Sequence, residues 1–126
     1  MKKLLLLFSH KLTKEQIKDA RENLQISNFI YLSEELQNKW SNFDIDDNDV
    51  VEGVKEFIIN NATIGDYILI QGEYGLVFKM VSWALDNGYI PIYSYSKREY
   101  INEVLSDGTI KNIHYFKHIC YKIYNY

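Results

Sequence analysis

Three short polar stretches hold the side chains whose chemistry stands out in this sequence, and each follows an apolar run. Imidazole transfers protons near neutral pH, while hydroxyls, amides and cations can bind phosphate oxygens. Paired glycines let the backbone come close to a phosphate or a ribose. Together the stretches predict a site for a phosphate-bearing ligand. Its candidates are Ser9, His10 and Lys11 from the first stretch, Gln71, Gly72, Glu73, Tyr74 and Gly75 from the second, and Lys97 and Arg98 from the third.

The apolar runs before these stretches predict buried strands over residues 4–8, 67–70 and 90–94. Thr13 and Gln16 form a capping box, which opens a helix after the first strand. Parallel strands place the loops that follow them at one edge of the sheet. We therefore expect loops 9–11, 71–75 and 94–98 to converge there, with the next helix beginning at Leu76.

The other elements complete an alternating pattern. It comprises a strand over 29–31, a helix capped by Ser33, an acidic loop over 43–48, a helix capped by Asp46 or Asp47, and a helix ended by Asn87-Gly88. Asp107-Gly108 predicts a tight hairpin between residues 98–105 and 110–124. The pattern favours one Rossmann-like α/β domain over residues 1–126. Its mostly parallel sheet is flanked by helices and ends in an antiparallel β-hairpin.

Composition excludes several classes of protein. The formal charge of −3 argues against a duplex-DNA binder, which needs a basic surface. The single cysteine excludes an internal disulfide and a cysteine-built zinc site, and residues 44–49 lack the glycine and terminal glutamate of a calcium loop. Met1-Lys2-Lys3 and the apolar run after it are too short for a signal peptide or a membrane span. We expect a cytoplasmic protein without a metal site.

Each candidate also has a plain structural explanation, and the residues alone leave both open. Ser9 could simply end a strand, and His10, Lys11 and Glu73 could face water. Tyr74 could stack on a base, yet it is one of 11 tyrosines. Gly72 and Gly75 could only shape a turn.

Arg98 is one of two arginines in the chain. Its planar guanidinium suits bidentate phosphate binding, and an ion pair with Glu99 or Glu103 is the alternative.

The final strand alternates between two half-apolar faces, which predicts sheet packing together with an oligomer contact. His118 is accordingly interpreted as structural or interfacial rather than as a metal ligand. One face carries His114, Phe116, His118, Cys120 and Tyr124, and the other carries Ile113, Tyr115, Ile119, Tyr121 and Ile123.

Several segments, in order and spacing, resemble a small type III CRISPR-associated family, the twentieth of the Csx series. The similarity runs over nearly the whole chain. It departs at the tail, where Cys120-Tyr121-Lys122 replaces an arginine-rich strand. The matching segments are Leu6-Leu7-Phe8-Ser9-His10-Lys11-Leu12-Thr13 with Gln16, Leu69-Ile70-Gln71-Gly72-Glu73-Tyr74-Gly75, Ser96-Lys97-Arg98-Glu99 and Phe116-Lys117-His118-Ile119.

The resemblance implies a CARF-like, homodimeric ring nuclease without a metal or other cofactor. Such a protein would bind a cyclic oligoadenylate messenger, above all cyclic tetra-adenylate, and linearise it to end type III antiviral signalling. In the corresponding hypothesis His10 transfers the proton, and Ser9 and Gln71 orient the ribose and phosphate. Backbone amides of loop 71–75, with Arg98 or Lys97, stabilise the developing charge.

Two other classes remain open from the sequence. The chain could bind and sequester the messenger without cutting it. It could also be a Rossmann-like domain that acts through protein contacts alone.

Overall fold

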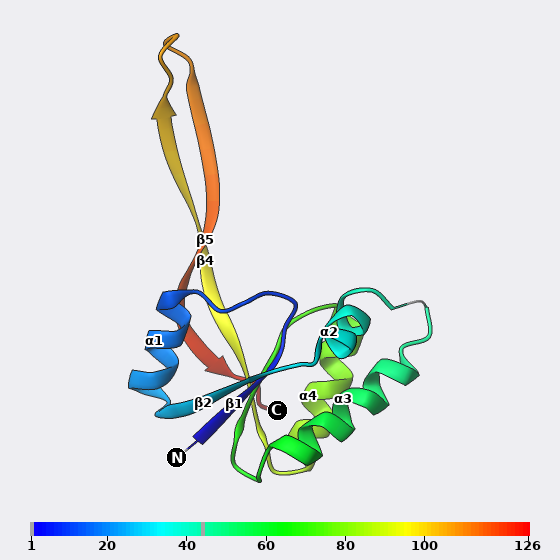
Figure 1. Cartoon of the computed structure of the whole chain (residues 1–126). Helices are drawn as coiled ribbons and strands as arrows, with labels where there is room; N and C mark the ends of the chain where they lie inside the picture. Colours follow the sequence, from blue (N-terminus) through cyan, green and yellow to red (C-terminus); the bar gives the residue numbers. More distant parts are fainter. Residues whose placement is uncertain (1, 44) are drawn as a thin grey trace.

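The computed structural model describes residues 2–43 and 45–126, and Figure 1 follows the chain through it. Met1 of the leader-like segment and Asp44 of the expected acidic loop lie outside the described residues. The elements are β1 (Lys2–Leu7), α1 (Lys14–Asn23), β2 (Ile26–Tyr31), α2 (Glu34–Ser41), α3 (Asn48–Asn61), β3 (Tyr67–Ile70), α4 (Tyr74–Asp86), β4 (Ile90–Val104) and β5 (Ile110–Ile123).

The five strands form one sheet in the order β2-β1-β3-β4-β5. β1 pairs in parallel with β2 and β3, β3 pairs in parallel with β4, and only β5 runs antiparallel, beside β4. The prediction of a mostly parallel α/β sheet with a C-terminal antiparallel hairpin is confirmed. Within the described residues, no helix is long and apolar enough to cross a membrane.

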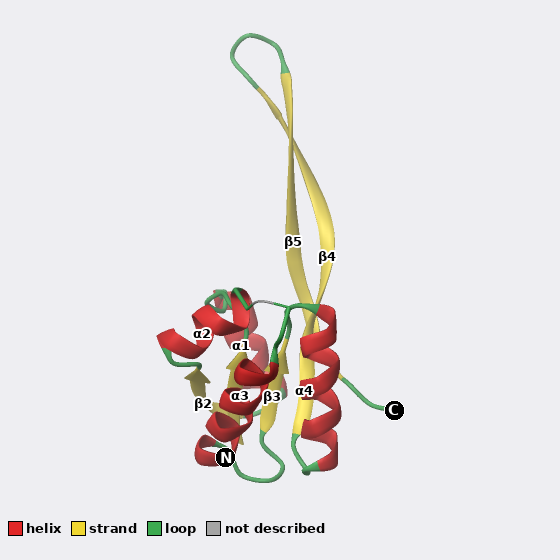
Figure 2. Ribbon diagram, turned by 90° about the vertical axis from the view of Figure 1, so that its right-hand side faces the viewer, coloured by secondary structure: helices red, strands yellow, loops and turns green. Residues whose placement is uncertain are grey.

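Helices cover both faces of the sheet (Figure 2). Leu4 and Leu6 of β1 pack with Ala20 of α1, whereas Leu5 and Leu7 pack in the core that α2, α3 and α4 share. The connection from β1 to β2 runs along the sheet in one direction, and the connections from β2 to β3 and from β3 to β4 run in the other. Because crossovers between parallel strands are right-handed, α1 lies on one face and α2, α3 and α4 lie on the other. All four leucines are 0% exposed, which explains why residues 4–7 of β1 are an unbroken apolar run.

Local hydrogen bonds fix where the helices begin. In the confirmed capping box, Thr13 Oγ1 accepts from the Gln16 amide at 3.2 Å, and Gln16 Oε1 accepts from the Thr13 amide at 2.8 Å. Ser33 Oγ caps α2, as expected. Of the two predicted caps of α3, Asp46 makes the hydrogen bond, because its side chain accepts from the Asn48 amide at 2.9 Å. Asp47 occupies the N-cap position but makes no side-chain cap hydrogen bond.

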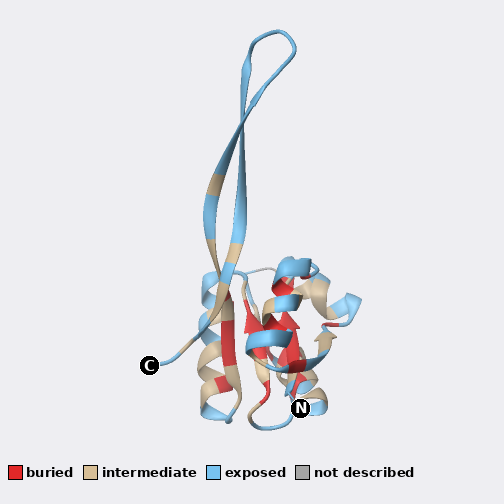
Figure 3. Cartoon of the chain, turned by 90° about the vertical axis from the view of Figure 1, so that its left-hand side faces the viewer, coloured by how far each residue is buried: buried red, intermediate tan, exposed pale blue. Residues whose placement is uncertain are grey.

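The hairpin differs from the prediction in length and connection. β4 continues unbroken through residues 94–98, so the expected third loop is wrong; antiparallel pairing with β5 keeps that segment extended. The connection spans residues 105–109, closed by a bond from the Leu105 amide to the Thr109 carbonyl, rather than a two-residue turn. Beyond the body the two strands form a projecting arm with exposed side chains (Figures 1 and 3).

A bulge in β5 corrects the expected face pattern. Tyr95 pairs with Cys120 but Ser96 pairs with His118, so Ile119 is an extra residue on β5. A bulge exchanges the faces of the residues on its two sides. His118 therefore lies beside Tyr121, with ring centroids 4.6 Å apart, and not on the face of Cys120.

Candidate functional site

The carboxyl ends of β1 and β3 and residues 93–96 in the middle of β4 meet at a cavity of about 820 Å³, called the edge cavity below. Its polar lining includes His10, Gln71, Ser94, Ser96 and His118. Aromatic side chains complete the wall, among them Phe8, Tyr93, Tyr95, Tyr115 and Phe116. Ligands of open α/β sheets bind at this edge, so the edge cavity is the leading candidate site.

A Ser94–His118–Asp19 triad forms one side of the edge cavity. Ser94 Oγ lies 2.5 Å from His118 Nδ1, and His118 Nε2 lies 2.6 Å from Asp19 Oδ2. The His118 side chain is 6% exposed and the Asp19 side chain 16%. The bulge at Ile119 turns His118 toward α1, where Asp19 lies. Three segments distant in sequence thus build a linked serine, histidine and aspartate.

Two glutamine side chains hold Ser94 in place. Gln16 Nε2 donates to Ser94 Oγ at 3.3 Å, and Gln71 Oε1 accepts from the Ser94 amide at 3.0 Å. Ser96 Oγ lies 3.3 Å from Ser94 Oγ. Gln16 is buried although it is polar, because its side chain serves both the capping box and this network.

Tyr121 closes the network on the α1 side. Its hydroxyl donates to the Gln16 carbonyl at 2.9 Å. Burial, together with the negative charge of Asp19 and the neighbouring Tyr31, raises the pKa of Tyr121 far above its ordinary value. Tyr121 is therefore a neutral donor that ties β5 to α1 across the working pH range.

A second hollow of about 780 Å³ lies on the α2 side of the same edge and includes Ser9, Gly72, Glu73 and Trp40 in its wall. Trp40 Nε1 donates to the Gln71 carbonyl at 3.0 Å. Gln71 thus accepts a hydrogen bond from α2 through its backbone carbonyl and one from Ser94 through its side chain.

Glu73 is the N-cap of α4. Its two carboxylate oxygens accept from the amides of Gly75 at 3.0 Å and Leu76 at 2.9 Å. Helix α4 consequently begins at Tyr74, two residues before the predicted start. Of the loop 71–75 amides that were expected to face a phosphate, the Gly75 amide is thus already bound by this carboxylate.

The expected convergence is found only in part. His10 and Gln71 both line the edge cavity. The His10 ring packs edge-on against the Phe8 ring, with 5.4 Å between the ring centroids. Ser9, Gly72 and Glu73 line the second hollow instead.

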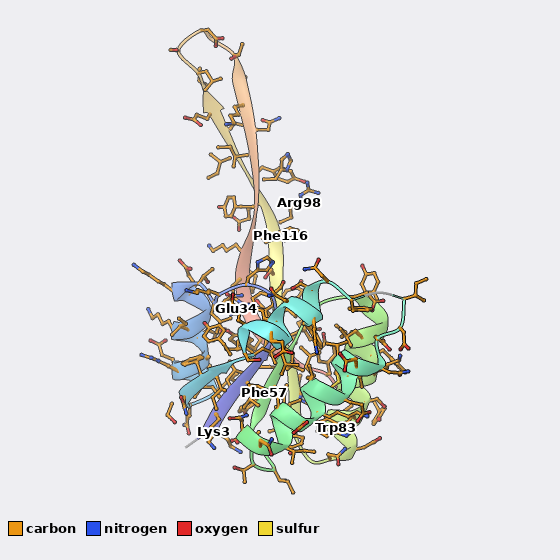
Figure 4. All side chains as sticks on the ribbon, turned by 45° about the vertical axis from the view of Figure 1, so that its right-hand side comes forward. Lys3, Glu34, Phe57, Trp83, Arg98 and Phe116 are labelled. Carbon is orange, nitrogen blue, oxygen red and sulfur yellow. The ribbon has the colours of Figure 1, made fainter. Side chains whose placement is uncertain are left out.

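The remaining candidates lie outside both cavities. Tyr74 and Gly75 form the first turn of α4, and Lys11 lies exposed between β1 and α1. Lys97 and Arg98 lie on exposed β4, where Figure 4 places Arg98 on the arm near Phe116. Among the described residues, no carboxylate forms the ion pair considered for Arg98.

Sequence reasoning missed the triad. In the sequence, Asp19 has no signal of its own, Ser94 lies where a predicted strand meets a predicted loop, and His118 is interpreted as structural or interfacial. The usable signal is on α1, where Gln16 and Asp19 bring polar groups toward the sheet side of an amphipathic helix. The contact of His118 with Ser94 and Asp19 could not be predicted, because strict alternation places His118 on the face of Cys120 and gives no sign of the bulge at Ile119.

This arrangement offers both binding and proton transfer. Tyrosine and phenylalanine rings provide stacking surfaces, and the glutamine and serine groups provide hydrogen bonds. His118 can exchange a proton with Ser94 while Asp19 holds its other nitrogen. Among the described residues that line the edge cavity, one is a lysine, Lys117, and one carries a carboxylate, Glu15.

Comparison with known proteins links the chain to one family along almost its full length. The family described as "Uncharacterized protein MJ1673 family" matches residues 2–122. A protein of Methanocaldococcus jannaschii, described as "Uncharacterized protein MJ1673", is 49% identical over 128 residues, which cover 99% of this chain and 98% of that protein. No solved structure gives a significant match.

Proposed function

The chain belongs to the Uncharacterized protein MJ1673 family, and from that premise we propose that it is a metal-independent ring nuclease for cyclic oligoadenylate. The preferred ring in this proposal is cyclic tetra-adenylate, whose cleavage would end type III CRISPR antiviral signalling in the cytoplasm. The carrying observation is that His10 and Gln71 reach the edge cavity together with Ser94 and Ser96.

The strand order supports a Rossmann-like, CARF-like assignment. β1 and β3 are neighbours whose connections leave in opposite directions along the sheet, and such a reversal forms a ligand crevice at the carboxyl edge. His10 follows β1 and Gln71 follows β3, so both lie at the reversal. The aromatic wall gives adenine rings a stacking surface.

The proposed reaction uses the ribose of the substrate as nucleophile. Its 2′-hydroxyl attacks the adjacent phosphorus, the bond from phosphorus to the 5′-oxygen breaks, and a 2′,3′-cyclic phosphate and a 5′-hydroxyl result. His10 accepts the proton of the 2′-hydroxyl, and a proton returns to the 5′-oxygen. Gln71 and Ser9 orient the ribose and phosphate, with Ser9 reaching the ligand from the second hollow.

Besides Lys117 in the wall of the edge cavity, positive charge is proposed to come from residues outside it. Lys97 and Arg98 follow Ser96 on β4 and are exposed, so a ring larger than the edge cavity can extend to them. Lys11, Gly72, Tyr74 and Gly75 surround the same edge and complete the proposed ligand contacts. Since Glu73 already caps α4, its proposed contribution is to hold loop 71–75 in shape.

The partner in this proposal is a second copy of the chain. β5 is an edge strand, and the arm exposes Ile101, Val104, Ile110 and Ile113. An isolated two-stranded ribbon is at best marginally stable in water, so an apolar arm of this length needs a cover. A cyclic tetranucleotide can hold a two-fold axis, so a symmetric dimer would present one edge cavity to each half.

The test is to incubate the purified protein, in excess and with EDTA, with cyclic tetra-adenylate and to resolve the products by chromatography. The expected result is linear product ending in a 2′,3′-cyclic phosphate. Recovery of the intact ring would refute the nuclease.

One observation favours a second candidate, a protein that sequesters the ring uncut. His10 is exposed, and no hydrogen bond holds its ring among the described residues, so it is poorly positioned as a proton acceptor. Saturable binding in a calorimeter, with the ring recovered unchanged, would select this candidate.

A further inference from the structure

We propose that the Ser94–His118–Asp19 triad is a second catalytic centre, in which Ser94 is an activated nucleophile toward uncharged carboxylic esters. The three side chains form one continuous hydrogen-bonded series, with 2.5 Å from Ser94 Oγ to His118 Nδ1 and 2.6 Å from His118 Nε2 to Asp19 Oδ2. A nucleophile, a base and a carboxylate that orients the base are the parts that activate a serine for covalent hydrolysis.

The carboxylate selects the tautomer that makes His118 a base. Ionised Asp19 only accepts hydrogen bonds, so the proton of neutral His118 resides on Nε2. The lone pair of Nδ1 then faces the Ser94 hydroxyl, which donates to it. A positive charge formed on the imidazole lies next to Asp19, where it is stabilised.

The surroundings of Ser94 favour its deprotonation and give it access to substrate. Gln16 Nε2 donates to Ser94 Oγ at 3.3 Å, so an amide stabilises negative charge on that oxygen. Ser94 and His118 both line the edge cavity. The other lining side chains are mostly aromatic or neutral, which suits an uncharged ester with an apolar or aromatic group.

The bulge in β5 sets the direction of the His118 side chain. Without the extra residue Ile119, alternation would place His118 on the face of β5 away from Tyr121 and α1. Bulges next to active sites redirect single side chains in this way. The bulge thus brings His118 of β5 to Asp19 of α1 and Ser94 of β4.

The reaction is balanced as ester plus water giving acid plus alcohol. Ser94 Oγ bonds to the carbonyl carbon while its proton moves to His118 Nδ1. The carbon–oxygen bond to the alcohol breaks, and that alcohol takes the proton from His118. Water then attacks the acyl-serine and loses a proton to His118, and the acid leaves as Ser94 regains its proton.

The test uses a short-chain alkyl fluorophosphonate on the whole protein, with the adduct located by peptide mass spectrometry. Ser94 Oγ displaces fluoride from phosphorus and the proton goes to His118, so the expected product is one phosphonyl group on Ser94. The assay needs no cyclic oligoadenylate, and its outcome is independent of the ring nuclease proposal.

Variants separate an activated serine from a structural network. His118→Ala should slow labelling of Ser94 by roughly a hundredfold or more, whereas His114→Ala, on the same strand but outside the cavity, should not. Asp19→Asn keeps the shape of the side chain but removes the charge beside His118, so it should also slow labelling of Ser94. It is the test variant if His118→Ala unfolds.

A wild-type protein without a Ser94 adduct, or labelled only on tyrosines, overturns the proposal. So does a Ser94 adduct that forms equally fast in Asp19→Asn and in folded His118→Ala.

Discussion

The indole Nε1–H of Trp40 donates to the backbone carbonyl of Gln71 across 3.0 Å, which bonds α2 to the loop that follows β3. The same nitrogen lies 2.8 Å from the position that a Cβ atom would take at Gly72. Trp40 is buried, and the carbonyl is the partner that its N–H needs. Glycine at position 72 is therefore explained by the approach of Trp40.

Gly72→Ala should destabilise the protein, because its methyl group would overlap the Trp40 ring. The expected loss is about 1–3 kcal/mol in the free energy of unfolding, measured in urea. Gly75→Ala is the matched control: its Cβ would lie 3.2 Å from a carboxylate oxygen of Glu73, so the cap of α4 would have to shift by a few tenths of an ångström. Because alanine is favoured over glycine within a helix by roughly 0.5–1 kcal/mol, the net change should be smaller than that of Gly72→Ala. Equal stability of Gly72→Ala and wild type would contradict the packing argument.

Glu73→Ala should weaken α4 at its start, because the amides of Gly75 and Leu76 lose their acceptor. We expect a loss of about 0.5–2 kcal/mol in unfolding free energy. Glu56→Ala, an exposed residue within α3, should stay within roughly 0.5 kcal/mol of wild type. An unchanged midpoint in Glu73→Ala would show that the cap contributes nothing.

His10→Ala and Arg98→Ala should each slow single-turnover cleavage of cyclic tetra-adenylate at least about tenfold, or roughly 1.4 kcal/mol of barrier. The first change removes the proposed proton acceptor, and the second removes charge beside the phosphates. Arg21→Ala is the matched control, because this other arginine lies on α1 over the ring of Phe29. Wild-type rates in both test variants would move the proposed site elsewhere.

Ile101→Lys should convert a dimer into a monomer, since it places a charge in the proposed contact between arms. Ile101 is 50% exposed and pairs with Ile113 across the hairpin, away from the edge cavity. Light scattering during gel filtration gives the mass. Ile59→Lys on α3, where the isoleucine is 61% exposed, should leave the mass unchanged. If the wild-type protein is a monomer, the proposal that the arm forms a dimer contact is wrong.

Local patterns predicted most of the architecture. Residues 67–70 form a strand with the predicted bounds, and the Thr13–Gln16 capping box and the Ser33 cap are present. These features depend on neighbouring residues, through apolar runs or through side chains that bind amides three positions away. The hairpin was predicted too, although β4 joins the separately predicted strands 90–94 and 98–105 into one, and the connection is longer than the predicted two-residue turn.

The sequence by itself determined a mostly parallel α/β sheet, its capped helices and the polar loops at its carboxyl edge. Only the tertiary structure decided which polar groups meet. Asp19 and His118 are 99 positions apart, and their contact depends on a bulge at Ile119 that periodicity does not reveal. Strand register is set by packing and pairing across the fold, and those forces place the triad in the edge cavity.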